Sequence, residues 1–144
     1  MMNKMLKDIV LYTSGGTDPF TGYATTGSPI TSSSSASVVL PFYPPYARLM
    51  VFIPLMIGTI TFVVGSPLGL TGFAVTISSP TTFHLIYTGN QTVLVYTVGS
   101  WRVTQQTIIA YYNIFMNGVY VSWSVASGST VSAYIHFEFE APED

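Results

Sequence analysis

The sequence predicts an all-β protein, an antiparallel β-sandwich of about eight strands. Short runs rich in Val, Ile, Thr, Phe and Tyr follow one another along most of the chain, and Gly, Pro, Ser and Asn separate them. No long helical pattern occurs beyond the first dozen residues. The final run alternates, because Val131, Ala133 and Ile135 would face the core while Ser132 and Tyr134 face outward. The same strand pattern would also suit a closed barrel.

The first 36 residues are predicted to form an extended N-terminal arm in front of a β-domain of residues 37–144. Apolar residues between positions 2 and 10 recur at helical spacing, so this segment is either a short amphipathic helix or a frayed lead into a strand at 9–12. A helix this short needs a groove, a neighbouring chain or a membrane to dock on. The polar stretch 13–37 fits either an arm that crosses a neighbouring subunit or a surface loop.

Nine later runs fit strands, and turn signals separate them. Asn117-Gly118 is expected to form a type I′ hairpin turn, and residues 88–91 and 127–129 predict two more sharp joints. One strand is apolar on both faces, so it needs a second cover, which we expect a neighbouring chain to supply. The doubly apolar strand is 48–55; the other runs are 37–42, 59–64, 73–77, 82–87, 92–98, 107–115, 119–125 and 131–140.

Charge is scarce in this chain. Asp, Glu, Lys and Arg make up 7% of the residues and the formal net charge is -2, whereas soluble domains carry about 25% charged residues. There is no basic field to hold phosphates, so direct nucleic-acid binding is not expected. A weakly charged surface gives little repulsion between copies and favours a homo-oligomer. Since the chain has no cysteine, disulfides and thiolate chemistry are excluded.

The sequence also bears on membrane insertion and on export. Residues 49–64 are uncharged and apolar, but as a helix they would rise only about 24 Å, short of the roughly 30 Å hydrocarbon core. Pro54 and Gly58 further disfavour a helix, so a membrane-spanning helix is not expected. An outer-membrane β-barrel stays a minor alternative. Asp8 interrupts the only candidate leader, so no signal peptide is expected.

Candidate catalytic residues are few. His84 and His136 are the only histidines. His136 and Glu138 would share a strand face about 7 Å apart, but two ligands do not complete a metal site and a solvent-facing pair is the preferred interpretation. No G-x-S-x-G motif occurs, and the acidic residues lie mostly near the chain ends. We therefore predict no enzyme activity, no metal and no cofactor.

Aromatic residues make up 15% of the chain and are the best candidates for interface anchors, since they bury a large area while keeping a polar group available. A sugar-binding platform is the competing interpretation, and it would need nearby Asp, Asn and Arg to hold hydroxyl groups. The predicted interface residues are Met5, Ile9, Phe20, Tyr23, Phe42, Tyr43, Tyr46, Phe52, Tyr111, Tyr112, Tyr120 and Trp123.

In general character the chain resembles single jelly-roll virion structural proteins of archaeal or bacterial viruses. The resemblance rests on the strand-rich residues 38–140, the polar arm before them and the hydroxyl-rich composition. It implies a jelly-roll-like subunit of a capsid, vertex or tail. Such a subunit would pack into homo-oligomeric rings with other virion proteins, be made in the host cytoplasm, and be exposed outside the cell after release.

Other interpretations stay open at this point. The chain could be a carbohydrate- or receptor-binding β-module, or a surface-filament subunit assembled by strand exchange. The low charge is also typical of proteins exposed to acid, where carboxylates are neutral.

Overall fold

The structure is a computed structural model that describes residues 4–69 and 72–142. In these ranges it contains twelve β-strands and no helix, and the strands pair antiparallel. The predicted all-β, antiparallel class is therefore confirmed, whereas the expected count of about eight strands is too low. Three of the additional strands lie in the segment assigned to the arm: β1 (Lys4–Thr13), β2 (Gly16–Thr17) and β3 (Ala24–Thr25). None of the described residues belongs to a helix that could cross a membrane.

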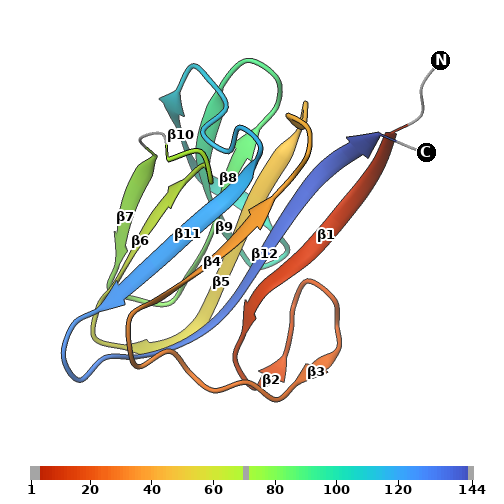
Figure 1. The fold of residues 1–144 in the computed structure, drawn as a ribbon. Helices are drawn as coiled ribbons and strands as arrows, with labels where there is room; N and C mark the ends of the chain where they lie inside the picture. Colours follow the sequence, from red (N-terminus) through yellow and green to blue (C-terminus); the bar gives the residue numbers. More distant parts are fainter. Residues whose placement is uncertain (1–3, 70–71, 143–144) are drawn as a thin grey trace.

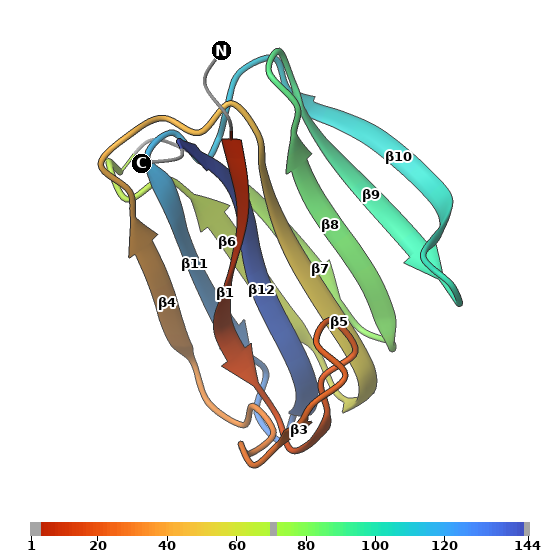
Figure 2. The ribbon, with the colours of Figure 1, turned by 90° about the vertical axis from the view of Figure 1, so that its right-hand side faces the viewer.

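Two sheets face each other, and a small β2-β3 hairpin lies beside them (Figures 1 and 2). The larger sheet has six strands in the order β1-β12-β5-β8-β9-β10, and the smaller has four in the order β4-β11-β6-β7. The remaining bounds are β4 (Ser34–Val39), β5 (Ala47–Ile57), β6 (Ile60–Gly65), β7 (Phe73–Ile77), β8 (Thr81–Tyr87), β9 (Thr92–Val98), β10 (Arg102–Ala110), β11 (Gly118–Val125) and β12 (Thr130–Pro142).

Eight of the strands pair in a nested order. β1 pairs with β12, β4 with β11, β5 with β8, and β6 with β7. Successive pairs alternate between the two sheets, so the chain follows the path of one long hairpin that has been rolled up. The β9-β10 hairpin is inserted after β8 and widens the six-stranded sheet.

β1 decides between the two interpretations of the N-terminal segment, a short helix and a lead into a strand at 9–12, and it contains the predicted strand. It pairs with β12 from Lys4, opposite Pro142, to Thr13, opposite Tyr134, with one bulge near Val10. A lone helix of this length is marginal in water, whereas the edge of β12 offers a full ladder of backbone hydrogen bonds. The helical interpretation is therefore wrong for residues 4–11, and residues 1–3 lie outside the described part of the chain. The division between arm and domain at 36/37 stays a prediction.

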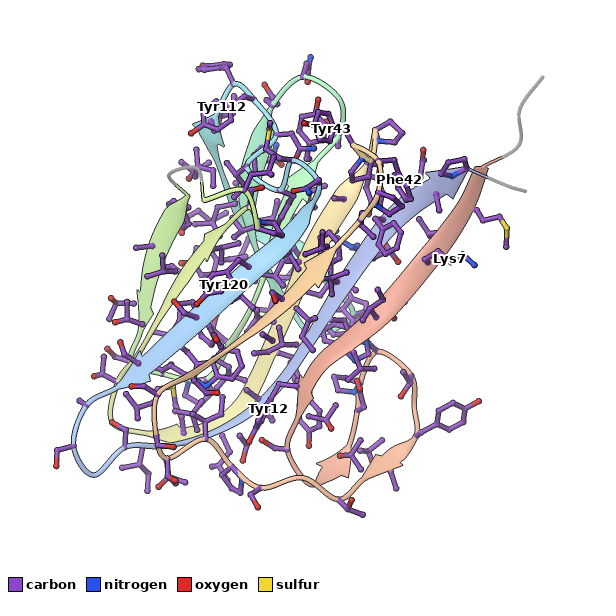
Figure 3. The ribbon with its side chains drawn as sticks, in the orientation of Figure 1. Lys7, Tyr12, Phe42, Tyr43, Tyr112 and Tyr120 are labelled. Atoms are coloured by element: carbon purple, nitrogen blue, oxygen red, sulfur yellow. The ribbon has the colours of Figure 1, made fainter. Side chains whose placement is uncertain are left out.

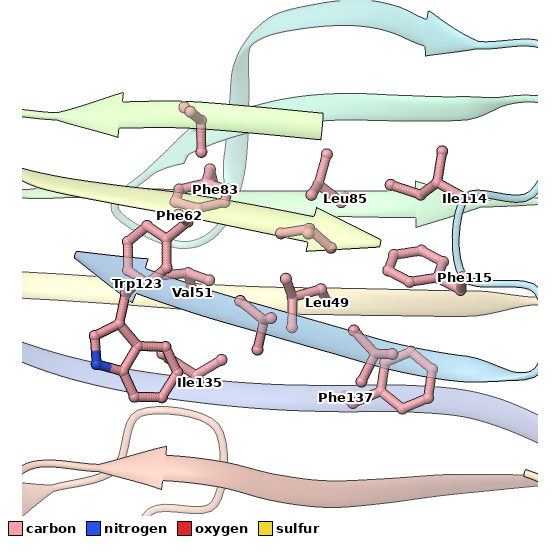
Figure 4. Close-up of a cluster of buried hydrophobic side chains, with 14 of the residues drawn as sticks. Leu49, Val51, Phe62, Phe83, Leu85, Ile114, Phe115, Trp123, Ile135 and Phe137 are labelled. Atoms are coloured by element: carbon pink, nitrogen blue, oxygen red, sulfur yellow. The ribbon is translucent and has the colours of Figure 1, made fainter. Parts of the chain in front are cut away.

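The core lies between the two sheets (Figure 4). Alternate residues of β5 and β8, such as Leu49 and Phe83, meet Phe62 of β6 and Trp123 of β11. Trp123 is only 4% exposed, so it belongs to the core although it was predicted as an interface anchor. Each such side chain contributes about 1.5–3 kcal/mol through burial.

The turn predictions had mixed outcomes. Residues 88–91 do join β8 and β9 as a hairpin, with Tyr87 opposite Thr92. The predicted hairpin at Asn117-Gly118 is wrong, because β10 ends at Ala110 and residues 111–117 cross from one sheet to the other. Gly118 instead opens β11 at a φ of 137°. Residues 127–129 likewise connect the two sheets, joining β11 to β12.

Candidate functional site

The candidate site is a hollow of about 360 Å³ on the outer face of the six-stranded sheet, called the hollow below. Strand register places the outward residues in cross-strand rows, because directly paired residues point to the same face. His136, Met50, His84 and Val95 form one such row across β12, β5, β8 and β9. Aliphatic side chains make up part of the wall, and charged and polar groups make up another part.

His136 lies beside the hollow and is fully buried, with an exposed fraction of 0%. Its Nδ1 is 2.9 and 3.1 Å from the two carboxylate oxygens of Asp8, and its Nε2 is 2.6 Å from Oδ2 of Asp18. Both contacts are hydrogen bonds when the ring carries a proton on each nitrogen. The edge of the Phe20 ring packs on the imidazole at a centroid distance of 4.9 Å.

This arrangement corrects the interpretation of His136 as half of a solvent-facing pair. The outward face of β12 is covered by the loop between β1 and β4, which the strand alternation could not indicate. Asp18 and His136 are 118 positions apart, and no local motif links them. The dipeptide Asp18-Pro19 is a local turn signal, which indicates a bend at this place but not its partner.

The three side chains Asp8, His136 and Asp18 do not form a metal centre. The imidazole ring lies between the two carboxylates, so their oxygens approach opposite sides of the ring instead of a common point. Within residues 4–69 and 72–142, no group of three or more His, Asp or Glu side chains could hold an ion. The cluster instead ties the loop to the sheet.

Hydrogen bonds that involve backbone groups hold the same loop against β12. Ser14 donates its N–H to the carbonyl of Ala133 at 2.9 Å, and its Oγ accepts the Ala133 N–H at 2.9 Å. Asp18 Oδ1 accepts the N–H of Phe20 at 2.9 Å, which places that ring at the wall of the hollow. The loop is therefore anchored at both Ser14 and Asp18.

The turn between β9 and β10 reaches the hollow from the other edge of the sheet. Its Trp101 ring stacks on Phe20 with centroids 5.5 Å apart and meets the edge of Phe52 at 6.2 Å. These contacts supply the second cover that strand β5 was expected to need. The expectation that a neighbouring chain supplies it is wrong at this end of β5, where the protein's own loops do so.

Charged groups on the wall of the hollow are paired. Arg48 lies 2.9 Å from Glu138 Oε1, and Tyr46 donates its hydroxyl to the same oxygen at 2.8 Å. Burial and this hydrogen bond raise the pKa of Tyr46 to about 12. Burial, assisted by the charge of Arg48, lowers the pKa of His84 to about 4, so that its imidazole is neutral at pH 7.

Three buried polar atoms at the hollow have no hydrogen-bond partner among the described residues: Arg48 Nε, His84 Nδ1 and Thr97 Oγ1. An unsatisfied buried polar atom typically costs about 1–3 kcal/mol. His136 is buried and both of its ring nitrogens are hydrogen-bonded, so it presents no free nitrogen to the hollow. The site is therefore suited to holding a ligand by packing and hydrogen bonds.

The predicted interface residues are spread over the molecule and form no continuous patch. Tyr43 and Tyr112 project at one end of the sandwich, whereas Tyr120 lies on the outer face of the four-stranded sheet (Figure 3). Met5, Tyr23, Tyr43, Tyr111, Tyr112 and Tyr120 are exposed, and Ile9, Phe20, Phe42, Tyr46 and Phe52 are partly buried. Phe20 is the only one of them that lines the hollow, and the interface roles of the exposed residues stay predictions.

No protein-family model matches the chain, and no curated protein is significantly similar to it. What the fold and the site define is a protein of two facing antiparallel sheets with a ligand-sized hollow on one outer face.

Proposed function

We propose that this chain is a structural subunit of a virion, a capsid, vertex or tail component with a jelly-roll fold. The nested pairing of β1 with β12, β4 with β11, β5 with β8 and β6 with β7 supports the jelly-roll assignment. In this assignment the β2-β3 and β9-β10 hairpins are insertions into the eight-stranded frame. Jelly rolls build many viral capsids but also lectins, so the function has to be argued from the surface.

The observation that carries the proposal is the absence of charge from the four-stranded sheet. Strands β4, β6, β7 and β11 contain no Asp, Glu, Lys, Arg or His. By contrast, the charged residues of the described strands all belong to β1, β5, β10 and β12 of the six-stranded sheet. One side of the sandwich can therefore be covered by protein without removing a charge from water.

The outward residues of this sheet are small, β-branched or aromatic. The register places Val63 beside Ser122 and Ala74, and Thr61 beside Ser124 and Thr76. Apolar groups are exposed among them, since Val39 is 67% and Val63 is 47% exposed. Tyr120 stands on the same face, and rings of this type are enriched at interfaces (Figure 3).

The occupant that fits this face is a second copy of the chain. A two-fold contact brings the same patch together from both copies, and a patch without charge meets itself without repulsion. The edge strands β4 and β7 also carry no charge, although charged side chains are a common means of blocking edge-to-edge pairing. These features support homo-oligomeric packing through this sheet. In the proposed function other virion proteins would complete the shell.

The test is the mass of the native particle, measured by light scattering over a range of concentrations. We expect the wild-type chain to form oligomers and Val63→Lys, which puts a charge in the centre of the uncharged face, to dissociate them. Gln106→Lys adds the same charge to the outer face of the other sheet and should leave the oligomer intact. A wild-type chain that stays monomeric at every concentration would refute the proposed function, and an intact Val63→Lys oligomer would refute the face.

A further inference from the structure

The polar residues at the hollow lie on three neighbouring strands. Arg48 of β5, His84 of β8 and Thr97 of β9 point to the same face. His84 and Thr97 are each only 6% exposed, and each keeps one buried atom without a partner among the described residues. These two atoms and Arg48 Nε are closed to the hollow, but His84 Nε2 is not among the buried atoms and the Arg48 side chain is 30% exposed. Arg48 and His84 can therefore offer hydrogen-bonding groups to a molecule in the hollow.

Trp101 supports the same conclusion independently. It lies in the turn between β9 and β10 with a φ of 65°, a left-handed conformation that a bulky residue rarely adopts and that glycine adopts freely. Strain of this kind persists where the side chain is needed at its place. The ring lines the hollow, packs on Phe20 and His84, and is still 42% exposed.

The charges of the wall select the class of ligand. An anion would face the carboxylates of Asp8 and Glu138, and the guanidinium of Arg48 is already paired with Glu138 at 2.9 Å. A cation would face Arg48 itself. A neutral molecule with hydroxyl groups, each both donor and acceptor, meets this mixed wall without repulsion.

The remaining wall is apolar. Met50, Ile86, Val95 and Val103 line the hollow together with the rings of Phe20 and Trp101. Its volume of about 360 Å³ falls in the range of small-molecule sites. A ligand that fits has one apolar face and several hydroxyl groups around it, which is the chemistry of a sugar ring.

We infer that the hollow binds one neutral sugar unit, whose apolar face packs on Trp101 while its hydroxyl groups bond to Arg48 and His84. The site lies on the sheet opposite the uncharged face, so it does not depend on the proposed assembly. A chain that assembles but binds no sugar, or binds sugar as a monomer, separates the two proposals. On a virion, such a site would recognise the terminal unit of a surface glycan.

The experiment uses the full chain and ligand-observed saturation-transfer NMR, which works for a monomer or a large particle. The probes are methyl glycosides of neutral hexoses and N-acetylhexosamines at up to about 50 mM, a level that detects millimolar binding. Glucuronic acid serves as the charged comparison. We expect at least one neutral glycoside to bind saturably, and weaker or no binding of the acid.

Variants that keep the fold decide which groups contact the sugar. His84→Phe removes both ring nitrogens and keeps an aromatic ring at the wall, so the variant should stay folded while its affinity falls about tenfold. Trp101→Gly suits the backbone angle and should lower affinity at least tenfold. Tyr112→Ala removes an exposed ring that does not line the hollow and should change nothing.

Two results would overturn the inference. Binding of none of the neutral glycosides rejects the site, and unchanged affinity in both His84→Phe and Trp101→Gly rejects its location. Preferential binding of glucuronic acid would reject the argument from charge.

Discussion

Replacing Asp18 with alanine tests how strongly the buried Asp8–His136–Asp18 cluster holds the loop to the sheet. The Asp18 side chain is 2% exposed and lies 2.6 Å from a fully buried imidazole nitrogen. Its removal leaves that nitrogen without a partner and also removes the acceptor of the Phe20 N–H. Breaking a buried pair in this way costs about 3–5 kcal/mol.

Asp8 provides the matched control, because it bonds to the other nitrogen of the same ring. Its side chain is 39% exposed, so water can replace much of what Asp8→Ala removes. The expected loss is about 1 kcal/mol or less, as for other exposed pairs. Both variants remove one carboxylate that bonds to His136, so their difference reports the burial of Asp18 together with its hydrogen bond to the Phe20 N–H.

The assay is urea unfolding together with a thermal melt at neutral pH. For a chain of this length the entropy of unfolding is about 0.3 kcal/mol/K, so Asp18→Ala should lower the Tm by about 10–17 °C and Asp8→Ala by about 3 °C. All samples need the same protein concentration, since assembly stabilises the folded state by mass action. Equal losses in the two variants would refute the assignment of Asp18 as the buried anchor.

Two further predictions concern pH and backbone conformation. Because His84 binds a proton near pH 6.5 when unfolded and only near pH 4 when folded, the free energy of unfolding should fall on the order of 2–3 kcal/mol as pH drops from 6.5 to 4. In His84→Gln the free energy of unfolding, measured with urea at each pH, should vary less between pH 6.5 and 4. An equal fall in the variant and the wild type would contradict this prediction. A fall of that size in the wild type also argues against adaptation to acid. Gly118→Ala should cost more than about 2 kcal/mol, since its Cβ would lie 1.9 Å from the Val38 carbonyl. Gly128 also has a positive φ, but an added Cβ would meet nothing within 4 Å, so Gly128→Ala should cost about 1 kcal/mol in the same urea unfolding. Equal costs for the two variants would show that backbone strain, and not the close contact, sets the loss.

Strand positions in the middle of the chain were accessible from the sequence. The predicted runs 73–77 and 92–98 coincide with β7 and β9, because β-branched and aromatic residues bounded by turn residues are a local signal. The run 107–115 was placed too late, since β10 spans Arg102–Ala110 and begins in polar residues that pair only because β9 lies beside them. For the same reason the sequence left β1 open between a short helix and a lead into a strand at 9–12, as its conformation is imposed by β12.

The candidate site was almost invisible in the sequence. No functional role was predicted from the sequence for Trp101 or Asp18, and His84 was noted there only as one of two histidines. Their roles depend on loops from opposite edges of the sheet meeting over β5, as the 5.5 Å contact of Phe20 with Trp101 shows. Trp101 beside a turn glycine was the one available signal, because a large aromatic residue is unusual at such a position.

By itself the sequence determined the all-β class, the low charge and the alternation of strand faces, since composition and period-two patterning are properties of neighbouring residues. Only the tertiary structure decided that the strand charges collect on one sheet and that His136 lies between Asp8 and Asp18, 128 and 118 positions away. Such contacts depend on which strands become neighbours and in what register. That choice is made by the packing of the whole chain, and no local pattern encodes it.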